Sequence, residues 1–249
     1  MRKLIKVVSV ILVIASVYGF KSAGKEKNKK EIAGWDGVYK GVQKDGGEEV
    51  VFVLFLKTDL TYVLQSKGKR DSVPTVLNGN LSWNKAGDEV TLESSENKHK
   101  IVYKKNGDVL EVMKVNKKSV AESERYQLQK IDLQEIADKY WKLIEVEGSA
   151  VEGSYLKEPH IFLKKEESSL SGSSECNTFN GRYNIEKTNQ IKFFKIAASM
   201  TACLNMEIET KLFRTLHTAD NYTISKDGQY LSLNKAKTTL ARFEVDYFK

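Results

Sequence analysis

Short apolar runs separated by polar turns fill the N-terminal half of the chain after residue 34. The Asn106-Gly107 pair is typical of a tight hairpin, and we expect a type I′ turn there. Only short turns separate the runs, so they predict an antiparallel sheet that curls into a barrel. The predicted strands, rich in β-branched and aromatic residues, are 50–56, 60–65, 88–93, 99–104, 109–114 and 125–130.

The C-terminal half repeats this style and adds one helix. Residues 131–137 are expected to link the halves, with one or two helical turns, and 226–229 is a predicted hairpin turn. Apolar residues at helical spacing predict a helix from Met206 to Thr218, with its stripe at Leu204, Ile208, Leu212, Phe213 and Leu216. The predicted strands are 140–143, 160–164, 190–195, 222–226, 231–234 and 240–245.

The expected fold is therefore mainly β, with two small antiparallel β-barrel-like domains, the second carrying one α-helix. We place the first domain at 35–131 and the second at 135–249. Residues 20–34 are rich in Lys, Glu, Asn, Ser and Gly, which predicts a polar tether.

Residues 1–19 have the pattern of a secretory signal peptide. Three cations precede an apolar run at 7–18, and small residues follow it. The run is short for a membrane span, so we expect cleavage near Phe20 or Lys25, with an uncleaved anchor as the alternative. Phe20 stands where a lipoprotein signal requires Cys, so no lipid is expected there. The sequence thus predicts a bacterial protein that is periplasmic or associated with the cell envelope.

The net charge of +7 lies almost entirely in this leader. Residues 1–31 hold eight cations and two acids, which leaves +1 for residues 32–249. Nucleic-acid binding needs clustered cations on one folded surface. Because the folded part has almost no net charge, we predict no nucleic-acid partner.

The chain has two cysteines, Cys176 and Cys203. Behind an export signal, they predict a disulfide that closes a loop of 27 residues. Two buried free thiols, packed as small apolar side chains, are the alternative.

Candidate metal and catalytic groups are sparse. Met200, Cys203 and Met206 stand three apart, a set that suits Cu(I), but core methionines at a strand-to-helix turn are the favoured interpretation. The three histidines lack metal-ligand spacing and are interpreted as surface or rim residues. Ser173-Ser174 has no marked base, and Glu207 and Glu209 are interpreted as solvated charges. We therefore predict no metal, no cofactor and no enzymatic activity.

The C-terminal half contains Trp141-x-Leu143, the run 170–177 followed by Phe179, Gly181 and Tyr183, and the pair Ala202-Cys203. In these motifs residues 135–249 resemble the META domain, also called the HslJ-like domain. Two departures are the order Met200-Thr201 and Glu175, where that family commonly has Gly. Locally, Asn177 is expected to turn the backbone after Cys176, and Gly181 to let the next strand begin. The motif residues, interpreted as structural, are Trp141, Gly172, Asn177, Phe179, Gly181, Tyr183 and Ala202, together with the two cysteines.

The N-terminal half opens with Trp35-x-Gly37-x-Tyr39-x-Gly41 and later has Gly79-x-Leu81-x-Trp83. In this pattern residues 35–131 resemble the lipocalin-like N-terminal domain of NlpE, a bacterial outer-membrane lipoprotein linked to envelope stress and copper. That domain carries Cys-x-x-Cys after its first strand, whereas residues 43–48 have no cysteine, so its redox or copper role does not carry over. The shared pattern is Trp35-x-Gly37-x-Tyr39-x-Gly41, Thr61-Tyr62-x-Leu64, Gly79-x-Leu81-x-Trp83 and Val90-x-Leu92.

The two resemblances imply a non-catalytic exported protein of envelope maintenance or stress response that acts through contacts with envelope proteins. The alternative is a carrier of a small apolar ligand inside a lipocalin-like barrel. The membrane is expected as a partner only through an uncleaved signal segment. Aromatic rings could line such a cup or simply fill the barrels; they are Trp35, Tyr39, Trp83, Trp141, Phe179 and Tyr183.

Overall fold

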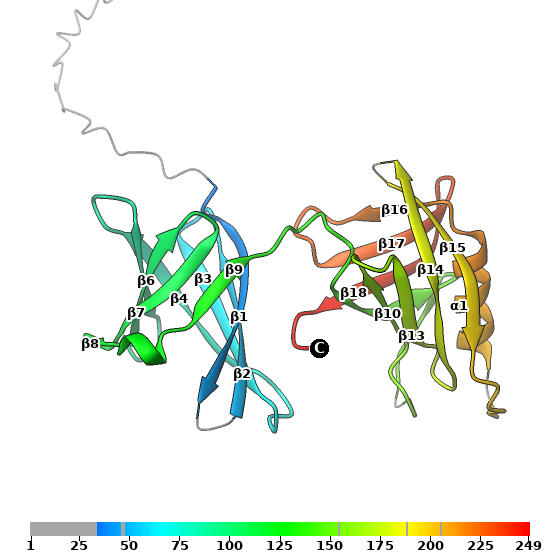
Figure 1. Cartoon of the computed structure of the whole chain (residues 1–249), viewed down its shortest axis with the longest axis horizontal. Coiled ribbons are helices and arrows are strands. Elements are labelled where there is room, and N and C mark those ends of the chain that lie inside the picture. The colour runs from blue at the N-terminus through cyan, green and yellow to red at the C-terminus, as the bar shows by residue number, and fades with distance from the viewer. Residues whose placement is uncertain (1–33, 46–47, 154, 188, 205) are drawn as a thin grey trace, which may run out of the picture. The chain divides into compact units, whose positions relative to one another are not determined.

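The computed structural model describes residues 34–45, 48–153, 155–187, 189–204 and 206–249. The signal peptide predicted at 1–19 and all but the last residue of the tether predicted at 20–34 lie outside these ranges. Within them the chain is mainly β, with one α-helix (Figure 1). None of the described helices is long and apolar enough to cross a membrane.

The elements form two sets, which belong to two separate sheets. The first set is β1 (Gly37–Asp45), β2 (Glu48–Leu56), β3 (Thr61–Gly68), β4 (Thr75–Trp83), β5 (Glu89–Ser94), β6 (Lys100–Asn106), β7 (Val109–Val115), β8 (Lys118–Ser119), the short 3₁₀ helix η1 (Glu122–Glu124) and β9 (Gln127–Lys130). The second set is β10 (Tyr140–Val146), β11 (Ser149–Ala150), β12 (His160–Lys164), β13 (Ser169–Ser173), β14 (Thr178–Lys187), β15 (Gln190–Ala198), α1 (Glu207–Thr218), β16 (Asn221–Ile224), β17 (Tyr230–Lys235) and β18 (Thr238–Asp246).

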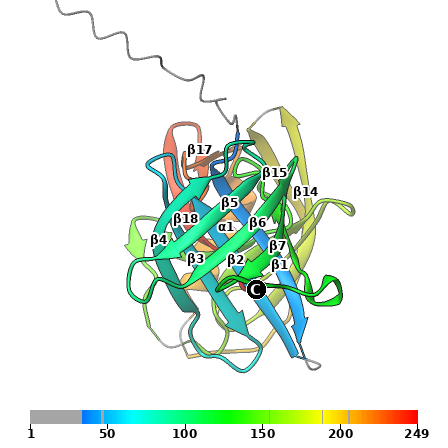
Figure 2. The same cartoon turned by 90° about the vertical axis from the view of Figure 1, so that its left-hand side faces the viewer.

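The first sheet closes into a barrel. Its strands β1 to β7 follow one another in antiparallel pairs, and β9 lies between β1 and β7. Because β6 also pairs with β7, the ring is complete. The strands β1 to β7 of this sheet are labelled in Figure 2.

Side chains fill the interior of the first barrel. Alternate residues of its strands point inward, and Leu54, Leu92 and Leu110 have no exposed surface. Two of the inner tyrosines have hydrogen-bond partners: the Tyr39 hydroxyl donates to the Trp35 carbonyl at 2.8 Å, and the Tyr103 hydroxyl is 2.9 Å from that of Tyr126. A packed interior of this kind is typical of small barrels without a ligand chamber.

The second sheet closes where β10 pairs with β18. Its weakest seam lies between β15 and β16, which are paired only at Gln190 and Asn221. The helix α1 stands between these two strands in the sequence and appears beside β15 in Figure 1. Its residues Leu212 and Leu216 are buried in the same apolar cluster as Trp141.

Most of the predicted strands are confirmed, and three details differ. The hairpin at β6 and β7 has Gly107 at φ +60° in the first central position, with Asn106 paired in the strand, so it has the signature of a type II′ turn and the predicted type I′ is wrong. Residues 131–137 form turns without a helix. The predicted apolar stripe of α1 wrongly includes Leu204, which precedes the helix and is fully exposed.

Candidate functional site

Cys176 and Cys203 form a disulfide at one end of the second sheet, with sulfurs 1.98 Å apart. Cys176 lies in the turn between β13 and β14, and Cys203 lies in the segment that leads from β15 to α1. The bond removes the thiolate that the Cu(I) hypothesis needs. Met200 is fully exposed, so it is not the core methionine that we expected.

Asn177, next to the disulfide, joins three segments of the chain. Its side-chain oxygen accepts from Ser199 Oγ at 2.7 Å and from Thr201 N at 2.8 Å. Its amide nitrogen donates to the Thr201 carbonyl and to both carboxylate oxygens of Glu209. The predicted local turn by this side chain is wrong, because its partners lie more than twenty residues away.

Glu209 is buried, with 7% of its surface exposed, which contradicts its interpretation as a solvated charge. Besides Asn177, Ser174 Oγ donates to its carboxylate at 2.5 Å. Its position in the first turn of α1 also suits a negative charge, since the helix dipole is positive there. The carboxylate is therefore held by several donors inside the protein. We call the disulfide with Ser174, Asn177 and Glu209 the cystine cluster.

The turn that carries Cys176 has an unusual backbone. Ser174 N donates to the Asn177 carbonyl at 2.9 Å across this loop, while Asn177 N donates to Glu209 Oε2 at 3.3 Å. Glu175 has φ +94°, while Cys176 is not among the described residues with positive φ. A φ of this sign is unfavourable for a residue with a Cβ and readily adopted by glycine. The geometry explains why glycine suits this position in the META domain.

Gly172 and Phe179 face each other across β13 and β14. A Cβ at Gly172 would lie 2.5 Å from the Phe179 ring and 2.3 Å from the His160 carbonyl oxygen, so the ring packs directly on the glycine backbone. Gly181 lies inside β14 at a register shift, so the prediction that it precedes the strand is wrong. Tyr183 is buried in the same apolar cluster, whereas Ala202 is exposed.

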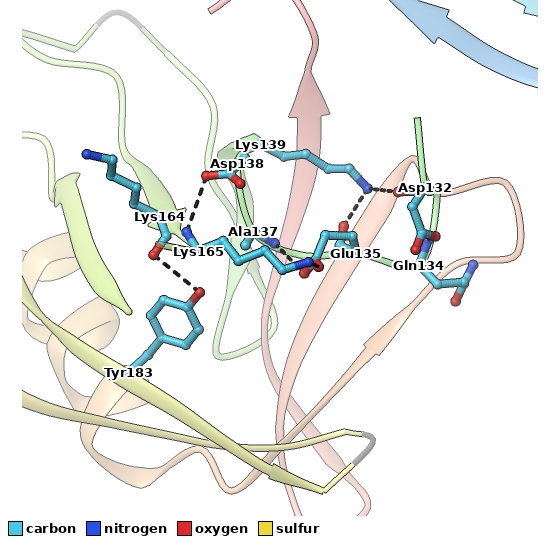
Figure 3. Close-up of polar contacts among 9 residues, drawn as sticks. All are labelled: Asp132, Gln134, Glu135, Ala137, Asp138, Lys139, Lys164, Lys165 and Tyr183. Carbon is cyan, nitrogen blue, oxygen red and sulfur yellow. Dashed lines mark hydrogen bonds and ion pairs between the residues drawn. The ribbon is translucent and has the colours of Figure 1, made fainter. Parts of the chain in front are cut away.

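Residues 132–139, which we call the connector, are held by their own polar groups (Figure 3). Lys139 is 7% exposed, and its ammonium donates to the carbonyls of Asp132 at 2.7 Å and Glu135 at 2.5 Å. The same ammonium lies 5.8 Å from the Trp141 ring centroid, a cation–π distance. Burial lowers the pKa of Lys139, and its acidic neighbours oppose that shift.

The connector is also tied to the second sheet. Trp141 Nε1 donates to the Ile136 carbonyl at 2.8 Å, and Lys165 pairs with Glu135 at 2.6 Å. Burial raises the pKa of Glu135, but hydrogen bonds from Lys165 and the Ala137 N–H outweigh it and hold the pKa below its usual value. The connector lines a pocket together with Tyr140 and Lys165. The charges of Lys165 and Glu135 in this pocket are already paired with each other.

The polar groups of the cystine cluster and of the connector bind other segments of the chain. Ser174 has no exposed surface, and its hydroxyl is bonded to Glu209 and to the Asn177 carbonyl. In the described part of the chain, no three His, Cys, Asp or Glu side chains gather as metal ligands. Glu209 was wrongly interpreted as a solvated charge, and Lys139 and Glu135 were not singled out, since acids and lysines in these positions are typical of solvated surfaces.

Comparisons with known families agree with the two sheets. Residues 134–247 match the family model of the META domain, and residues 46–124 match that of the NlpE N-terminal domain. Both predicted resemblances are therefore confirmed. Neither is a family of enzymes.

A search of curated proteins gives no match. Among solved structures, the chain is similar to the Cpx pathway activator NlpE from Escherichia coli, at 15% identity over 82% of this chain and 94% of that chain, with a TM-score of 0.28. At that score the likeness supports no further conclusion.

Proposed function

We propose that this chain, which joins an NlpE-type N-terminal domain to a META domain, is an exported, non-catalytic protein of the bacterial cell envelope. Its role is envelope maintenance or stress response, through contacts with other envelope proteins. We assign the domains to 35–131 and 135–249, behind a cleaved signal peptide at 1–19. The motif residues of the second domain act in this proposal as structural elements.

The main support for export is the disulfide between Cys176 and Cys203. Disulfides persist in oxidising compartments such as the bacterial periplasm, and are rare in the cytosol. The leader supplies the route, since its cations and apolar run have the order of a secretory signal.

The packed first barrel favours protein contacts over the carrier alternative. Its buried side chains form one cluster that includes Tyr39, Tyr62 and Tyr103 in the interior. The Tyr103 hydroxyl is 2.9 Å from that of Tyr126, so these two polar groups are paired with each other inside the barrel. An apolar ligand would have to displace this packing, which is costly in a close-packed core.

Export is tested by the thiol state and the new N-terminus. The full chain is expressed in a bacterial host beside a variant that lacks residues 1–19, and both are alkylated and analysed by mass spectrometry. We expect the full chain in the periplasmic or envelope fraction, cut near Phe20 or Lys25, with Cys176 and Cys203 bridged. The leaderless control should carry two alkylated thiols. Identical thiol states in both, or a diacylglyceryl adduct, would contradict the proposal.

The proposed role in protein contacts is tested by identifying the molecules that remain bound to the purified protein. The protein is crosslinked in an envelope fraction, purified, and analysed for protein and for lipid. A defined protein that recurs in replicates, and is absent when an unrelated exported protein is the bait, supports the adaptor role. Lipid recovered in a stoichiometric amount without a protein would favour the carrier.

A further inference from the structure

The segment 199–204, which leads from β15 toward α1, is fixed at alternate residues (Figure 1). Ser199 Oγ donates to Asn177 Oδ1 at 2.7 Å, and Thr201 N donates to the same oxygen at 2.8 Å. The last fixed point is the disulfide, through Cys203. Two hydrogen bonds and one covalent bond therefore hold this segment on the cystine cluster.

Met200 stands between two of these fixed points. Its side chain is 99% exposed, although the residues on both sides of it are bonded to Asn177. Leu204 is also fully exposed, but its side chain has no reactive atom. Met200 presents a thioether sulfur to the solvent from an anchored backbone, and a thioether is readily oxidised.

The other sulfur atoms of the described chain are less accessible. Both cysteines are joined in the disulfide, so neither is a thiol. Met206 is 37% exposed and precedes the first turn of α1, where its carbonyl accepts from Thr210 N at 2.9 Å. Met113 lies in β7 and is partly buried. Accessibility therefore places Met200 first, Met206 second and Met113 last.

We infer that Met200 is a modification site, at which hydrogen peroxide oxidises the thioether to a sulfoxide and a reductase restores it. The sulfur lone pair attacks one peroxide oxygen, the O–O bond breaks, and an S–O bond forms. A proton passes from the transferred oxygen to the departing hydroxide, which leaves as water. Sulfur loses two electrons and the peroxide gains them. In repair, a dithiol returns two electrons and two protons, and the sulfoxide oxygen leaves as water.

The fold tolerates this change at Met200 because the sulfoxide remains in water. A sulfoxide is polar, and burial of a polar group without a partner costs free energy. Folded and unfolded chains are therefore affected equally at Met200. Most of the Met206 side chain is covered, so the same oxidation there should weaken the second domain.

This inference goes beyond the proposed function and does not rest on it, because the purified protein is sufficient to test it. Each cycle of oxidation and repair at Met200 consumes one molecule of peroxide. The disulfide and α1 stay in place throughout the cycle. The chain would thus act as a scavenger of peroxides.

The first test follows oxygen uptake in the mature protein with the disulfide intact. The protein is treated with hydrogen peroxide, and its peptides are analysed by mass spectrometry at successive times. We expect Met200 to gain one oxygen about tenfold faster than Met113, with Met206 between them. In urea the three rates should become equal, because all three side chains are then exposed. Equal rates at Met200 and Met113 in the folded protein would overturn the inference.

The second test separates Met200 from Met206. In Met206→Leu, peroxide should oxidise Met200 at an unchanged rate and leave the unfolding temperature within about 1 °C of that of the untreated variant. In the matched control Met200→Leu, oxidation of Met206 should lower the unfolding temperature by several degrees. A fall in unfolding temperature on oxidation of Met200 would contradict the inference.

Repair is measured on oxidised Met206→Leu. Two methionine sulfoxide reductases, one for each sulfoxide epimer, are supplied with thioredoxin and should remove the added oxygen from Met200 in the folded protein. A sulfoxide that persists at Met200 would end the inference, since the site would then be oxidised only once. If Met206→Leu fails to fold, the oxidation rates and the repair of Met200 in the unchanged protein decide the question.

Discussion

The side-chain amide of Asn177 donates to both carboxylate oxygens of Glu209 at 3.0 Å, across 32 residues of sequence. The contact ties the turn before β14 to the first turn of α1, beside the disulfide that links the same regions. Both residues are buried, so the carboxylate depends on protein donors in place of water. The covalent and the polar link thus fix the same end of the barrel.

Removing the Asn177 side chain should therefore be strongly destabilising. Asn177→Ala leaves the buried Glu209 carboxylate with fewer donors, and we expect a loss of about 2–4 kcal/mol. The free energy of unfolding is measured by hydrogen exchange of the second sheet in urea. The matched control is Asn180→Ala, an exposed asparagine on β14, with an expected change within about 0.5 kcal/mol. Equal losses in the two variants would show that the Asn177 contacts are unimportant.

Glu175→Gly should stabilise the second domain. Its φ of +94° is unfavourable for any residue with a Cβ and accessible to glycine. Relief of this strain is expected to raise the free energy of unfolding by about 1 kcal/mol, after the greater chain entropy of glycine is included. Glu175→Ala keeps the Cβ and serves as the control, with no gain expected. A loss in the glycine variant would indicate that the Glu175 side chain contributes more than its backbone costs.

The sequence predicted the strands that have strong local patterns and missed those that depend on distant neighbours. β7 alternates inward residues such as Leu110 and Val112 with outward ones, and it was predicted within one residue. β13 is Ser-Leu-Ser-Gly-Ser, with no β-branched residue, and was missed. It forms a strand because Phe179 of β14 packs on Gly172, a contact that local propensity does not reveal.

Of the candidate site, only the disulfide could be predicted from the sequence. Two cysteines behind an export signal suffice to predict a disulfide. Glu209 has the position of an ordinary first-turn acid, and its burial depends on Asn177 and Ser174, which are more than thirty residues earlier. Lys139 likewise has no local signal, because its partners are backbone carbonyls of a turn.

Gly172→Ala should disrupt the contact with Phe179. The added methyl group would lie 2.3 Å from a backbone oxygen and 2.5 Å from the ring, so strands must shift. We expect a loss of about 2–3 kcal/mol, at the upper end for overpacking. At Gly181 the nearest atoms to an added Cβ are 3.2 Å away, so Gly181→Ala should cost less than half as much. Thermal unfolding of the two variants tests this order, and a reversed order would contradict it.

The disulfide should contribute about 3.5 kcal/mol to the stability of the second domain, from the entropy of a 27-residue loop in the unfolded chain. The double variant Cys176→Ser/Cys203→Ser removes it, and unfolding in urea measures the loss. Wild-type protein reduced and alkylated under denaturing conditions provides the comparison. A loss below about 1 kcal/mol would mean that Asn177 and Glu209 already confine the same loop.

His160 should make the second domain less stable in mild acid. Its ring stacks on Tyr140 at 4.3 Å, with Nδ1 2.8 Å from the Glu158 carbonyl oxygen. Burial lowers its pKa below the ordinary 6.5, which outweighs the opposing effect of Glu158. The neutral ring is thus favoured in the fold, and the unfolded chain takes up the proton first.

The stabilisation from neutral His160 is therefore complete above about pH 6.5 and is lost as the pH falls toward the lower pKa of the folded state. An NMR titration of the His160 ring should give a midpoint below 6.5. His160→Gln, which cannot be protonated, should flatten the fall in stability between pH 6.5 and 5 while leaving the carboxylate-dependent fall at lower pH. A midpoint above 6.5, or an unchanged slope in His160→Gln, would show that the Glu158 carbonyl and carboxylate outweigh burial.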